Sequence, residues 1–440
     1  MLYRIIIGNY KSFAEDTEFD MFPNLKRVSF ANHVYTDGAT PVLKSCAIYG
    51  ANGAGKSNLI KAMLFIKKFA TTFEAGKGNQ KLRNWYLGNR FRLPVEDESK
   101  PISIIVEFEI NGKAYLYCVE IDANGVKSEA LLLSGLGKNN NHIVFERSYG
   151  SITFKKAKIA DGIKRIMERQ MVDNPSFSVL AANGILHLTE NEDMQNAYLW
   201  FKEKLEVFEV SREIPWLIDH FKSNGELMDF VGEVFGNIGL GIQSLQIKDE
   251  SFDQWMKEAE GDDGKLLDMM TSDKGVSVSK MQDDVPLLTV TEEDGKRLVR
   301  EFIFQQIGKN GYVSGMDALS QSTGTLRLLT LIPALYFAIN DDKMVLLDEI
   351  DNGIHPMLIK KLVMFFGESQ SKGQLIFTTH ETALLNQQEL LRPDEVWFVE
   401  KVEGCTKMYS LNDFKIHKTI SIENGYLDGR FGAIPFIGTL

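Results

Sequence analysis

The feature that most restricts what this chain can fold into is a glycine-rich segment near residue 50. A short apolar run, Cys46–Tyr49, leads into Gly50-Ala-Asn-Gly-Ala-Gly-Lys-Ser57, and an amphipathic stretch follows at 58–66. A GxxxxGK[ST] pattern between a strand and a helix is typical of a phosphate-binding loop (P-loop). Its glycines let backbone N–H groups turn inward around phosphates, and the helix N-terminus adds partial positive charge. The pattern therefore predicts an α/β fold.

This loop supplies the first candidate site residues. Lys56 is expected to place a positive charge at the phosphates, and the Ser57 hydroxyl is expected to ligate Mg²⁺. The residues expected to surround the phosphates with their backbone are Asn52, Gly53, Ala54 and Gly55.

Length and composition narrow the class of protein. The 440 residues exceed one ordinary core, and the balance of 44% hydrophobic and 25% charged residues is that of a globular chain. The net charge of −11 argues against generic coating of nucleic acid or anionic lipid, although local basic patches remain compatible with it. Three scattered cysteines indicate a reducing compartment. No apolar run reaches the ~20 residues that span a bilayer, so we expect a cytoplasmic protein without a membrane segment.

The sequence predicts one nucleotide-binding unit that is formed by the two outer segments of the chain, with a long region between them. We expect the N-terminal part at 1–155, where Asn111-Gly112 between alternating runs predicts a hairpin in an antiparallel patch. Helical periodicity predicts a mainly helical insertion at 156–300. The C-terminal part of the core is expected at 301–440.

A second apolar run ends in two carboxylates. Lys343-Met-Val-Leu-Leu is followed directly by Asp348 and Glu349. An uninterrupted apolar run is typical of a strand buried in a parallel sheet, and ligands bind beyond the carboxyl ends of such strands. We therefore predict that Asp348 reaches Mg²⁺ and that Glu349 orients or deprotonates an attacking water. Runs ending in Asp-Glu are common, so this prediction depends on the pairing with the P-loop.

A third apolar run, Gln374–Thr379, ends at His380, which is 380 − 348 = 32 residues after Asp348. Two interpretations stay open. The histidine either hydrogen-bonds the γ-phosphate and senses hydrolysis, or it is structural. Its spacing after the carboxylate strand favours the first.

Ser322 precedes a helical stretch that ends shortly before the carboxylate strand. It is either an ordinary helix N-cap or an anion site with exposed backbone N–H groups behind it. The ordinary cap is the simpler interpretation, and the position between the P-loop and the carboxylate strand is what favours the anion site.

Taken together, these segments resemble the ATP-binding-cassette (ABC) type of P-loop ATPase. The resemblance is to the soluble branch that contains the SMC and OLD (overcoming-lysogenisation-defect) proteins. Residues 50–57 match Walker A of that class, and Asp348-Glu349 match Walker B with its catalytic glutamate. Residues 322–325 resemble the signature motif, 352–356 resemble the D-loop, and His380 resembles the switch histidine.

The resemblance extends toward both ends. Ile7–Phe13 is similar to the first strand of this branch, beside which adenine lies, and this implies a contact from Lys11. Leu427–Pro435 resembles the tail of small stand-alone ATPases in this group. Those proteins occur as ATPase subunits of two-component bacterial defence systems against phage, such as PARIS, Septu and relatives.

Two departures from the family pattern stand out. The signature has Thr325 where transporters usually have glutamine. No glutamine between 60 and 120 can be assigned as the Q-loop, and Gln80 is a candidate only by position.

The resemblance implies ATP and Mg²⁺ as cofactors and a site that one chain cannot complete. In this class ATP lies between the Walker A of one subunit and the signature of another, so Ser322 and Gly324 would act on a second copy's ATP. We therefore expect a homo-oligomeric ATPase, with Glu349 and His380 as catalytic residues. We expect it to regulate a separately encoded effector, such as a nuclease, in antiphage defence, with a nucleic acid or a phage protein as candidate trigger.

Three other classes of protein fit this sequence less well. An OLD-type nuclease would need an acidic metal-binding domain after His380, where 440 − 380 = 60 residues follow. An SMC-like DNA-binding protein would carry coiled-coil heptads, which we do not find. A transporter ATPase would have a short helical insert in the middle. Basic residues that either contact DNA or lie on a solvated surface are Lys155, Lys156, Lys158, Lys164 and Arg165.

Overall fold

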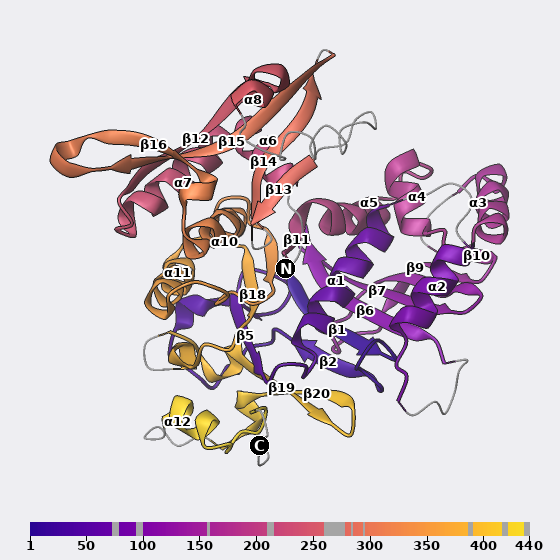
Figure 1. Ribbon diagram of the computed structural model, residues 1–440. Coiled ribbons are helices and arrows are strands. Elements are labelled where there is room, and N and C mark those ends of the chain that lie inside the picture. The colour runs from indigo at the N-terminus through magenta and orange to yellow at the C-terminus, as the bar shows by residue number, and fades with distance from the viewer. Residues whose placement is uncertain are drawn as a thin grey trace. The chain divides into compact units, whose positions relative to one another are not determined.

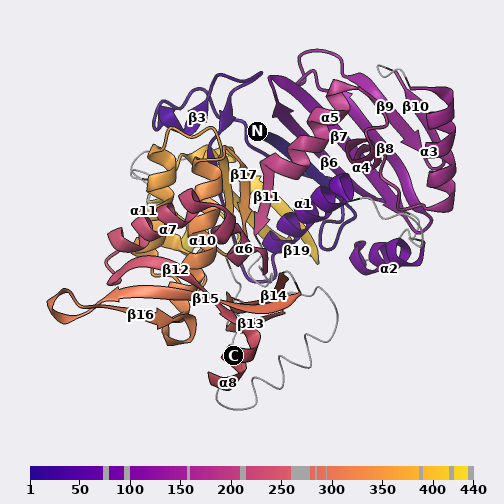
Figure 2. The ribbon, with the colours of Figure 1, turned by 90° about the horizontal axis from the view of Figure 1, so that it is seen from above.

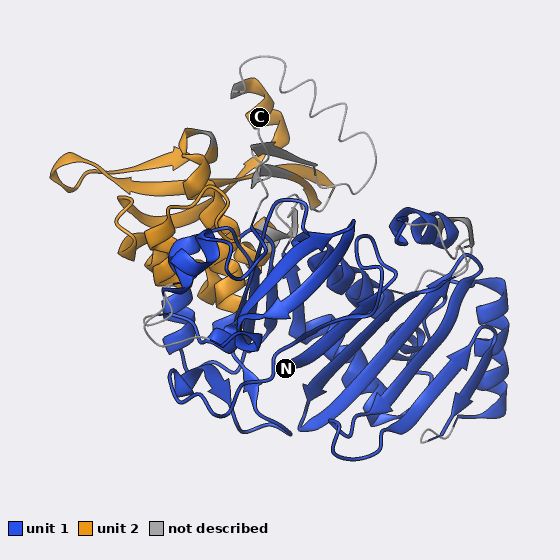
Figure 3. Ribbon diagram, turned by 90° about the horizontal axis from the view of Figure 1, so that it is seen from below, with its two compact units in different colours: residues 1–208, 338–349, 363–440 blue, residues 209–337, 350–362 orange. Residues whose placement is uncertain are grey.

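The chain folds into two compact units (Figure 3). Unit 1 contains residues 1–208, 338–349 and 363–440, and unit 2 contains residues 209–337 and 350–362, so the chain passes between them after residues 208, 337, 349 and 362. The computed structural model describes residues 1–72, 79–93, 100–155, 159–208, 215–258, 278–282, 285–293, 295–385, 390–415 and 421–434.

The first sheet of unit 1 is antiparallel and has seven strands in the order β10-β9-β8-β7-β6-β1-β2 (Figure 1). The strands are β1 (Leu2–Gly8), β2 (Thr17–Asp20), β6 (Ile102–Ile110), β7 (Lys113–Asp122), β8 (Gly125–Leu133), β9 (His142–Ser148) and β10 (Ser151–Phe154). Asn111 and Gly112 join β6 to β7 with φ angles of 53° and 72°, which are the positive values that a tight hairpin turn requires. The predicted hairpin and antiparallel patch are confirmed.

The second sheet of unit 1 has six strands in the order β11-β17-β18-β5-β19-β20 and is parallel except for the last pair. The strands are β5 (Ser45–Gly50), β11 (Leu205–Phe208), β17 (Met344–Leu347), β18 (Gln374–Thr378), β19 (Val396–Val402) and β20 (Cys405–Ser410). Every residue of β5, β17 and β18 is buried, which explains their uninterrupted apolar sequences. Strands from the two ends of the chain therefore build one sheet, as expected for a mixed α/β fold. A separate short pair is formed by β3 (Val34–Tyr35) and β4 (Val42–Leu43).

Helix α1 (Lys56–Thr71) follows the P-loop strand and buries one face in the core of unit 1. Leu59, Met63 and Ile66 recur at helical spacing on that face and belong to a continuous core that includes residues of both sheets. The other helices of unit 1 are α2 (Asn79–Asn89), α3 (Asp161–Asp173), α4 (Val179–Leu186), α5 (Glu192–Leu199) and α12 (Ile422–Leu427). Figure 2 shows α1, α4 and α5 from above.

Unit 2 combines helices with an antiparallel five-stranded sheet. Its strands are β12 (Ile242–Ser251), β13 (Val278–Gln282), β14 (Val285–Glu293), β15 (Lys296–Ile307) and β16 (Val313–Asp317). Its helices are α6 (Pro215–Ser223), α7 (Gly225–Asn237), α8 (Phe252–Glu258) and the larger parts of α10 (Thr323–Ile339) and α11 (Pro356–Glu368). Phe235 of α7 meets Phe304 of β15 edge to face, with ring centroids 5.9 Å apart.

The expected mainly helical insertion at 156–300 differs from this arrangement. The described residues from 161 to 237 are helical apart from β11 and connecting segments, but residues 242–251, 278–282, 285–293 and 296–307 supply β12 to β15. The units also divide at residue 208 rather than at 155 or 300. The sheet of unit 2 packs on α7, and β15 alternates between buried and half-buried residues from Glu301 to Gln305, as one covered face requires. The helical periodicity behind the expectation came from residues 163–171 and 194–205, which precede this sheet.

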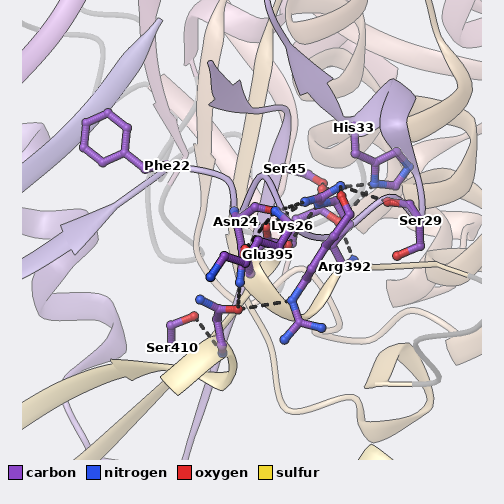
Figure 4. Close-up of polar contacts among 12 residues, drawn as sticks. Phe22, Asn24, Lys26, Ser29, His33, Ser45, Arg392, Glu395 and Ser410 are labelled. Atoms are coloured by element: carbon purple, nitrogen blue, oxygen red, sulfur yellow. Dashed lines mark hydrogen bonds and ion pairs between the residues drawn. The ribbon is translucent and has the colours of Figure 1, made fainter. Parts of the chain in front are cut away.

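A buried polar cluster holds the start of β5 against the segment between β2 and β3. It consists of Asn24, His33, Ser45, Arg392, Asp394 and Glu395 (Figure 4). The Arg392 guanidinium is paired with Asp394 through two hydrogen bonds of 2.9 and 2.8 Å, and it also donates to the backbone oxygen of Ser29 at 2.8 Å.

Glu395 completes this cluster from a fully buried position. One carboxylate oxygen accepts from Ser45 Oγ at 2.7 Å and the other accepts from Arg392 N at 2.7 Å, while His33 Nδ1 lies 3.0 Å from both. Each charge in the cluster has partners, as buried charges require.

The described residues also bear on two composition-based expectations. Burial raises the pKa of the Cys46 thiol well above its usual value and that of the half-buried Cys118 to about 12, so both thiols stay protonated at neutral pH. Within the described chain, no helix combines the length and apolarity that a bilayer crossing needs.

The buried polar cluster generates a stability prediction. Replacing Arg392 by leucine leaves the Asp394 carboxylate buried without its guanidinium, so we expect the free energy of unfolding to fall by about 3–5 kcal/mol. Urea titration monitored by tryptophan fluorescence measures it. Lys26→Ala, which removes an exposed side chain in the same segment, is the control and should change stability by less than about 0.5 kcal/mol. An Arg392→Leu protein as stable as this control would contradict the role given to the pair.

Candidate functional site

Three adjacent parallel strands bring the three sequence motifs to one edge of the second sheet. β18 lies between β17 and β5, with Leu347 opposite Phe377 and Phe377 opposite Ala47. The segments that leave these strands carry Asp348, His380 and the P-loop, respectively. Because the carboxyl ends of parallel strands meet at one edge, the register places these segments together, as the sequence predicted.

Two glycines shape the P-loop for different reasons. Gly53 has φ of 77° and open space around it, so glycine supplies the backbone conformation there. Gly55 has φ of 121°, and a Cβ atom would come within 2.2 Å of Thr406 Oγ1. In the described structure no side chain caps α1 at Gly55, so the first turn of the helix is available to an anion.

A polar clamp of Ser12, Asn58 and Thr406 holds the loop from outside. Thr406 Oγ1 lies 2.7 Å from the Ala54 oxygen and 2.7 Å from Ser12 Oγ. Asn58 Nδ2 donates to Ser12 Oγ at 2.7 Å, and Thr406 N donates to the Ser12 oxygen at 2.7 Å. The clamp joins the segment after β1, the P-loop helix and strand β20.

Lys56 and His380 meet directly. The Lys56 ammonium donates to the Gly50 oxygen at 2.8 Å and to the Ala51 oxygen at 3.3 Å, and its Nζ lies 3.0 Å from His380 Nε2. Lys56 is 6% exposed, whereas His380 is exposed. A single charge is thus oriented by the loop's own carbonyl groups and by the histidine.

Asp348 and Glu349 follow β17 and share one neighbour. Thr378 Oγ1 donates to Asp348 Oδ1 at 2.6 Å and accepts from Glu349 N at 2.7 Å. Asp348 N donates to the Phe208 oxygen at 2.9 Å, which ties the carboxylate segment to β11 as well. Glu349 has φ of 50°, a left-handed conformation that is uncommon for a side chain of this kind.

The donor set at this edge suits magnesium. The Ser57 hydroxyl and the Asp348 carboxylate are hard oxygen donors, and Mg²⁺ usually takes only one or two protein ligands and completes its shell with water and phosphate. Among the described residues, no group of three or more His, Cys, Asp or Glu side chains could hold a metal ion.

The signature-like and D-loop-like segments lie in unit 2 and pack on each other. The exposed Ser322 caps α10, since Thr325 N donates to Ser322 Oγ at 3.2 Å, and the N-cap expectation is confirmed. At Gly324 a Cβ atom would lie 2.7 Å from the Gly353 oxygen, so the close approach of the two segments requires glycine. Gly353 itself has φ of 72°.

Lys11 lies beside aromatic residues. Its φ is 51° and its Nζ lies 5.7 Å from the centre of the Tyr10 ring. Tyr10 stacks on Trp85 at 6.1 Å, and Trp85 stacks on Phe65 of α1 at 3.8 Å. Gln80 belongs to α2, but its side chain is outside the described part, so the Q-loop assignment is not tested.

Sequence reasoning missed the hydroxyl groups that organise this edge. Ser12 lies in the segment Ile7–Phe13 and Thr378 in the run Gln374–Thr379, but no sequence pattern assigned a role to either hydroxyl group or to that of Thr406. The one usable signal was a pair of threonines, Thr378-Thr379, inside an otherwise apolar run before His380.

The contact at Gly55 generates a binding prediction. Gly55→Ala forces Thr406 or the loop to move, so we expect the affinity for ATP to fall by about tenfold or more, which corresponds to about 1.4 kcal/mol. Binding of a fluorescent ATP analogue measures it. Gly112→Ala also places alanine at a positive φ, but with open space around it and in the β6–β7 turn. This control should lose stability without losing affinity, and a Gly55→Ala protein with wild-type affinity would contradict the steric argument.

Comparison with known proteins adds a family. Residues 46–386 match the model of the family described as "AAA domain, putative AbiEii toxin, Type IV TA system". No curated protein matches the chain.

Solved structures with a similar arrangement include three SMC heads at low identity. An SMC head bound to the C-winged helix domain of ScpA has 14% identity and a TM-score of 0.47, over 97% of this chain and 99% of that one. The SMC head domain from Thermotoga maritima has 13% identity and a TM-score of 0.38, over 94% and 99%. An Smc head with an extended coiled coil bound to the C-terminal domain of ScpA, derived from Pyrococcus furiosus, has 12% identity and a TM-score of 0.43, over 98% and 99%.

Proposed function

The chain belongs to the AAA-domain family described as putative AbiEii toxin, Type IV TA system, and on that premise we propose that its P-loop ATPase domain binds ATP with Mg²⁺ and hydrolyses it. One observation carries the proposal. The P-loop, Asp348-Glu349 and His380 leave three neighbouring parallel strands at the same edge, and Lys56 Nζ lies 3.0 Å from His380 Nε2.

The P-loop residues take the binding roles. The Lys56 ammonium exchanges its contacts with backbone oxygens for contacts with phosphate oxygens, which are stronger acceptors because they are charged. The backbone N–H groups of residues 52–57 would surround the phosphates, and Lys11 would contact the adenine. Ser57 and Asp348 are the residues that would hold Mg²⁺, which when bound neutralises charge that develops on the phosphates.

Glu349 and His380 take the catalytic roles. Glu349 orients the attacking water and accepts its proton, and His380 donates a hydrogen bond to the γ-phosphate. His380 is exposed and adjoins Lys56, so the group that senses the γ-phosphate and the group that binds it share one location.

The second half of the proposed site comes from another copy of the chain. Ser322 is exposed at the N-terminus of α10, a helix of 17 residues whose dipole favours an anion there. Ser322 and Gly324 of one copy would face the ATP held by the Walker A of another, so engagement of ATP would assemble a homo-oligomer.

We propose that this assembly regulates a separately encoded effector in antiphage defence. The support is the family description, which names a putative toxin of a type IV toxin–antitoxin system, together with the motif order.

Substitution of Glu349 by glutamine tests the catalytic role. The amide keeps the shape but cannot accept a proton, so we expect ATP to stay bound while kcat falls by about a hundredfold or more. Steady-state phosphate release and binding of a fluorescent ATP analogue measure the two quantities on the same sample. Normal turnover in Glu349→Gln would show that another group activates the water.

Mixing two inactive variants tests the composite site. Lys56→Ala removes the positive charge that would contact the phosphates. Ser322→Arg places a bulky cation at the signature-like segment. Each protein alone should therefore be inactive. A mixed dimer of the two has one site with an intact Walker A and an intact signature, so mixing should restore ATP hydrolysis.

The restored activity should increase with the fraction of mixed dimer, which native mass spectrometry measures. If the mixture stays as inactive as its components while mixed dimers form, Ser322 does not complete the site of another copy. Full activity of Ser322→Arg alone would show that Ser322 has no role in hydrolysis.

A further inference from the structure

The hydroxyl group of Thr378 is the only side-chain contact that the described residues provide to both Asp348 and the backbone of Glu349. Thr378 is the last residue of β18 and its side chain is fully buried. The Oγ1 atom lies 2.6 Å from Asp348 Oδ1 and 2.7 Å from Glu349 N. A hydroxyl has one proton and two lone pairs, so it can donate to the carboxylate and accept from the N–H group at the same time.

The position of Glu349 explains why this acceptor matters. The parallel pairing of β17 with β18 ends at Leu347 and Phe377, and Asp348 N bonds to the Phe208 oxygen on the β11 side. The next N–H group, that of Glu349, lies beyond the paired residues on the β18 side. The Thr378 hydroxyl therefore replaces the backbone carbonyl that a longer strand would have offered.

The backbone conformation of Glu349 is a second, independent reason why the hydrogen bond to Thr378 matters. Its φ of 50° is a left-handed conformation, which a residue with a Cβ adopts only when its surroundings stabilise it. A hydrogen bond to the N–H group of the strained residue stabilises this turn. The turn decides in which direction the Glu349 side chain leaves the strand.

The hydrogen bond to Asp348 also restricts how its carboxylate group can rotate. The hydrogen bond from Thr378 to Oδ1 restricts the orientation of the Asp348 carboxylate, which would help to hold Mg²⁺. One hydroxyl thus sets the orientation of the two acidic residues to which different roles are assigned.

We infer that Thr378 is a positioning residue for ATP hydrolysis, which holds Asp348 and Glu349 in register through one hydroxyl group. The inference rests on the proposed function, because Thr378 acts only through the residues to which that function gives metal-binding and catalytic roles. This role requires a hydroxyl group at position 378 but does not require the methyl group of threonine.

Three substitutions separate the hydroxyl from the shape of the side chain. Thr378→Val keeps the shape and removes the hydroxyl, Thr378→Ser keeps the hydroxyl, and Thr378→Ala removes the hydroxyl without any steric demand. Each full-length variant is compared with wild type for steady-state ATP hydrolysis, for the dissociation constant of a non-hydrolysable ATP analogue, and for the Mg²⁺ concentration that gives half-maximal rate.

A positioning role predicts a division between kcat and binding. We expect Thr378→Val and Thr378→Ala to lower kcat by about tenfold or more, to change nucleotide affinity by less than about threefold, and to raise the Mg²⁺ requirement. Thr378→Ser should keep kcat within about threefold of wild type. A residue with a merely structural role would change affinity and stability together with kcat.

Several results would overturn the inference. Turnover in Thr378→Val or Thr378→Ala equal to that in Thr378→Ser would show that the hydroxyl is not needed. If the valine variant does not fold, the alanine variant decides. Loss of nucleotide binding in the alanine variant but not in the serine variant would assign the hydroxyl to the fold instead. Wild-type protein that does not hydrolyse ATP would refute the proposed function itself. If the wild type is active and all three Thr378 variants hydrolyse ATP at the wild-type rate, only the role of Thr378 is refuted.

Discussion

The pairing of β18 between β17 and β5 is the constraint on which the rest of the site depends. This register brings Asp348, Thr378 and the P-loop to the same edge of one sheet, although Leu375 and Ser45, which pair directly, are 330 positions apart (375 − 45). A shift of one residue in any of these strands would turn its side chains to the other face of the sheet. The complete burial of all three strands opposes such a shift, because it would move apolar side chains out of their packing positions.

Backbone conformations that are uncommon for residues with a Cβ gather around this edge. Gly53 and Gly55 take positive φ angles in the P-loop without steric cost, whereas Glu349 does so at a cost of about 1–2 kcal/mol. The hydrogen bond from Glu349 N to Thr378 offsets part of that cost, and Thr406 and Ser12 hold the loop. The polar cluster around Glu395 contributes from the opposite end of β5, where it accepts a hydrogen bond from Ser45. The P-loop strand is therefore held by polar contacts at both ends and by apolar packing between them.

The sequence was sufficient for the features that depend on local pattern. The P-loop, the uninterrupted apolar strands before Asp348 and His380, and the Asn111-Gly112 hairpin are each specified within about ten residues, and all are present. Features that depend on tertiary pairing were not predictable. Thr406 and Ser12 are 394 positions apart in sequence, and nothing in either segment alone indicates their contact. The sheet of unit 2 was missed because the helical period of residues 163–171 and 194–205, which are mostly helical, was extended over the strands that begin at residue 242.

The order in which the strands are synthesised has a consequence for how this protein reaches its native state. β5 emerges early, but its two neighbours in the sheet, β18 and β19, begin at residues 374 and 396. Until those residues leave the ribosome, a fully apolar strand and the glycine loop after it have no sheet to join. Such non-local pairing slows folding and exposes unpaired strand edges to aggregation. The sheet around the P-loop can therefore be completed only after β19, which ends at Val402, has left the ribosome.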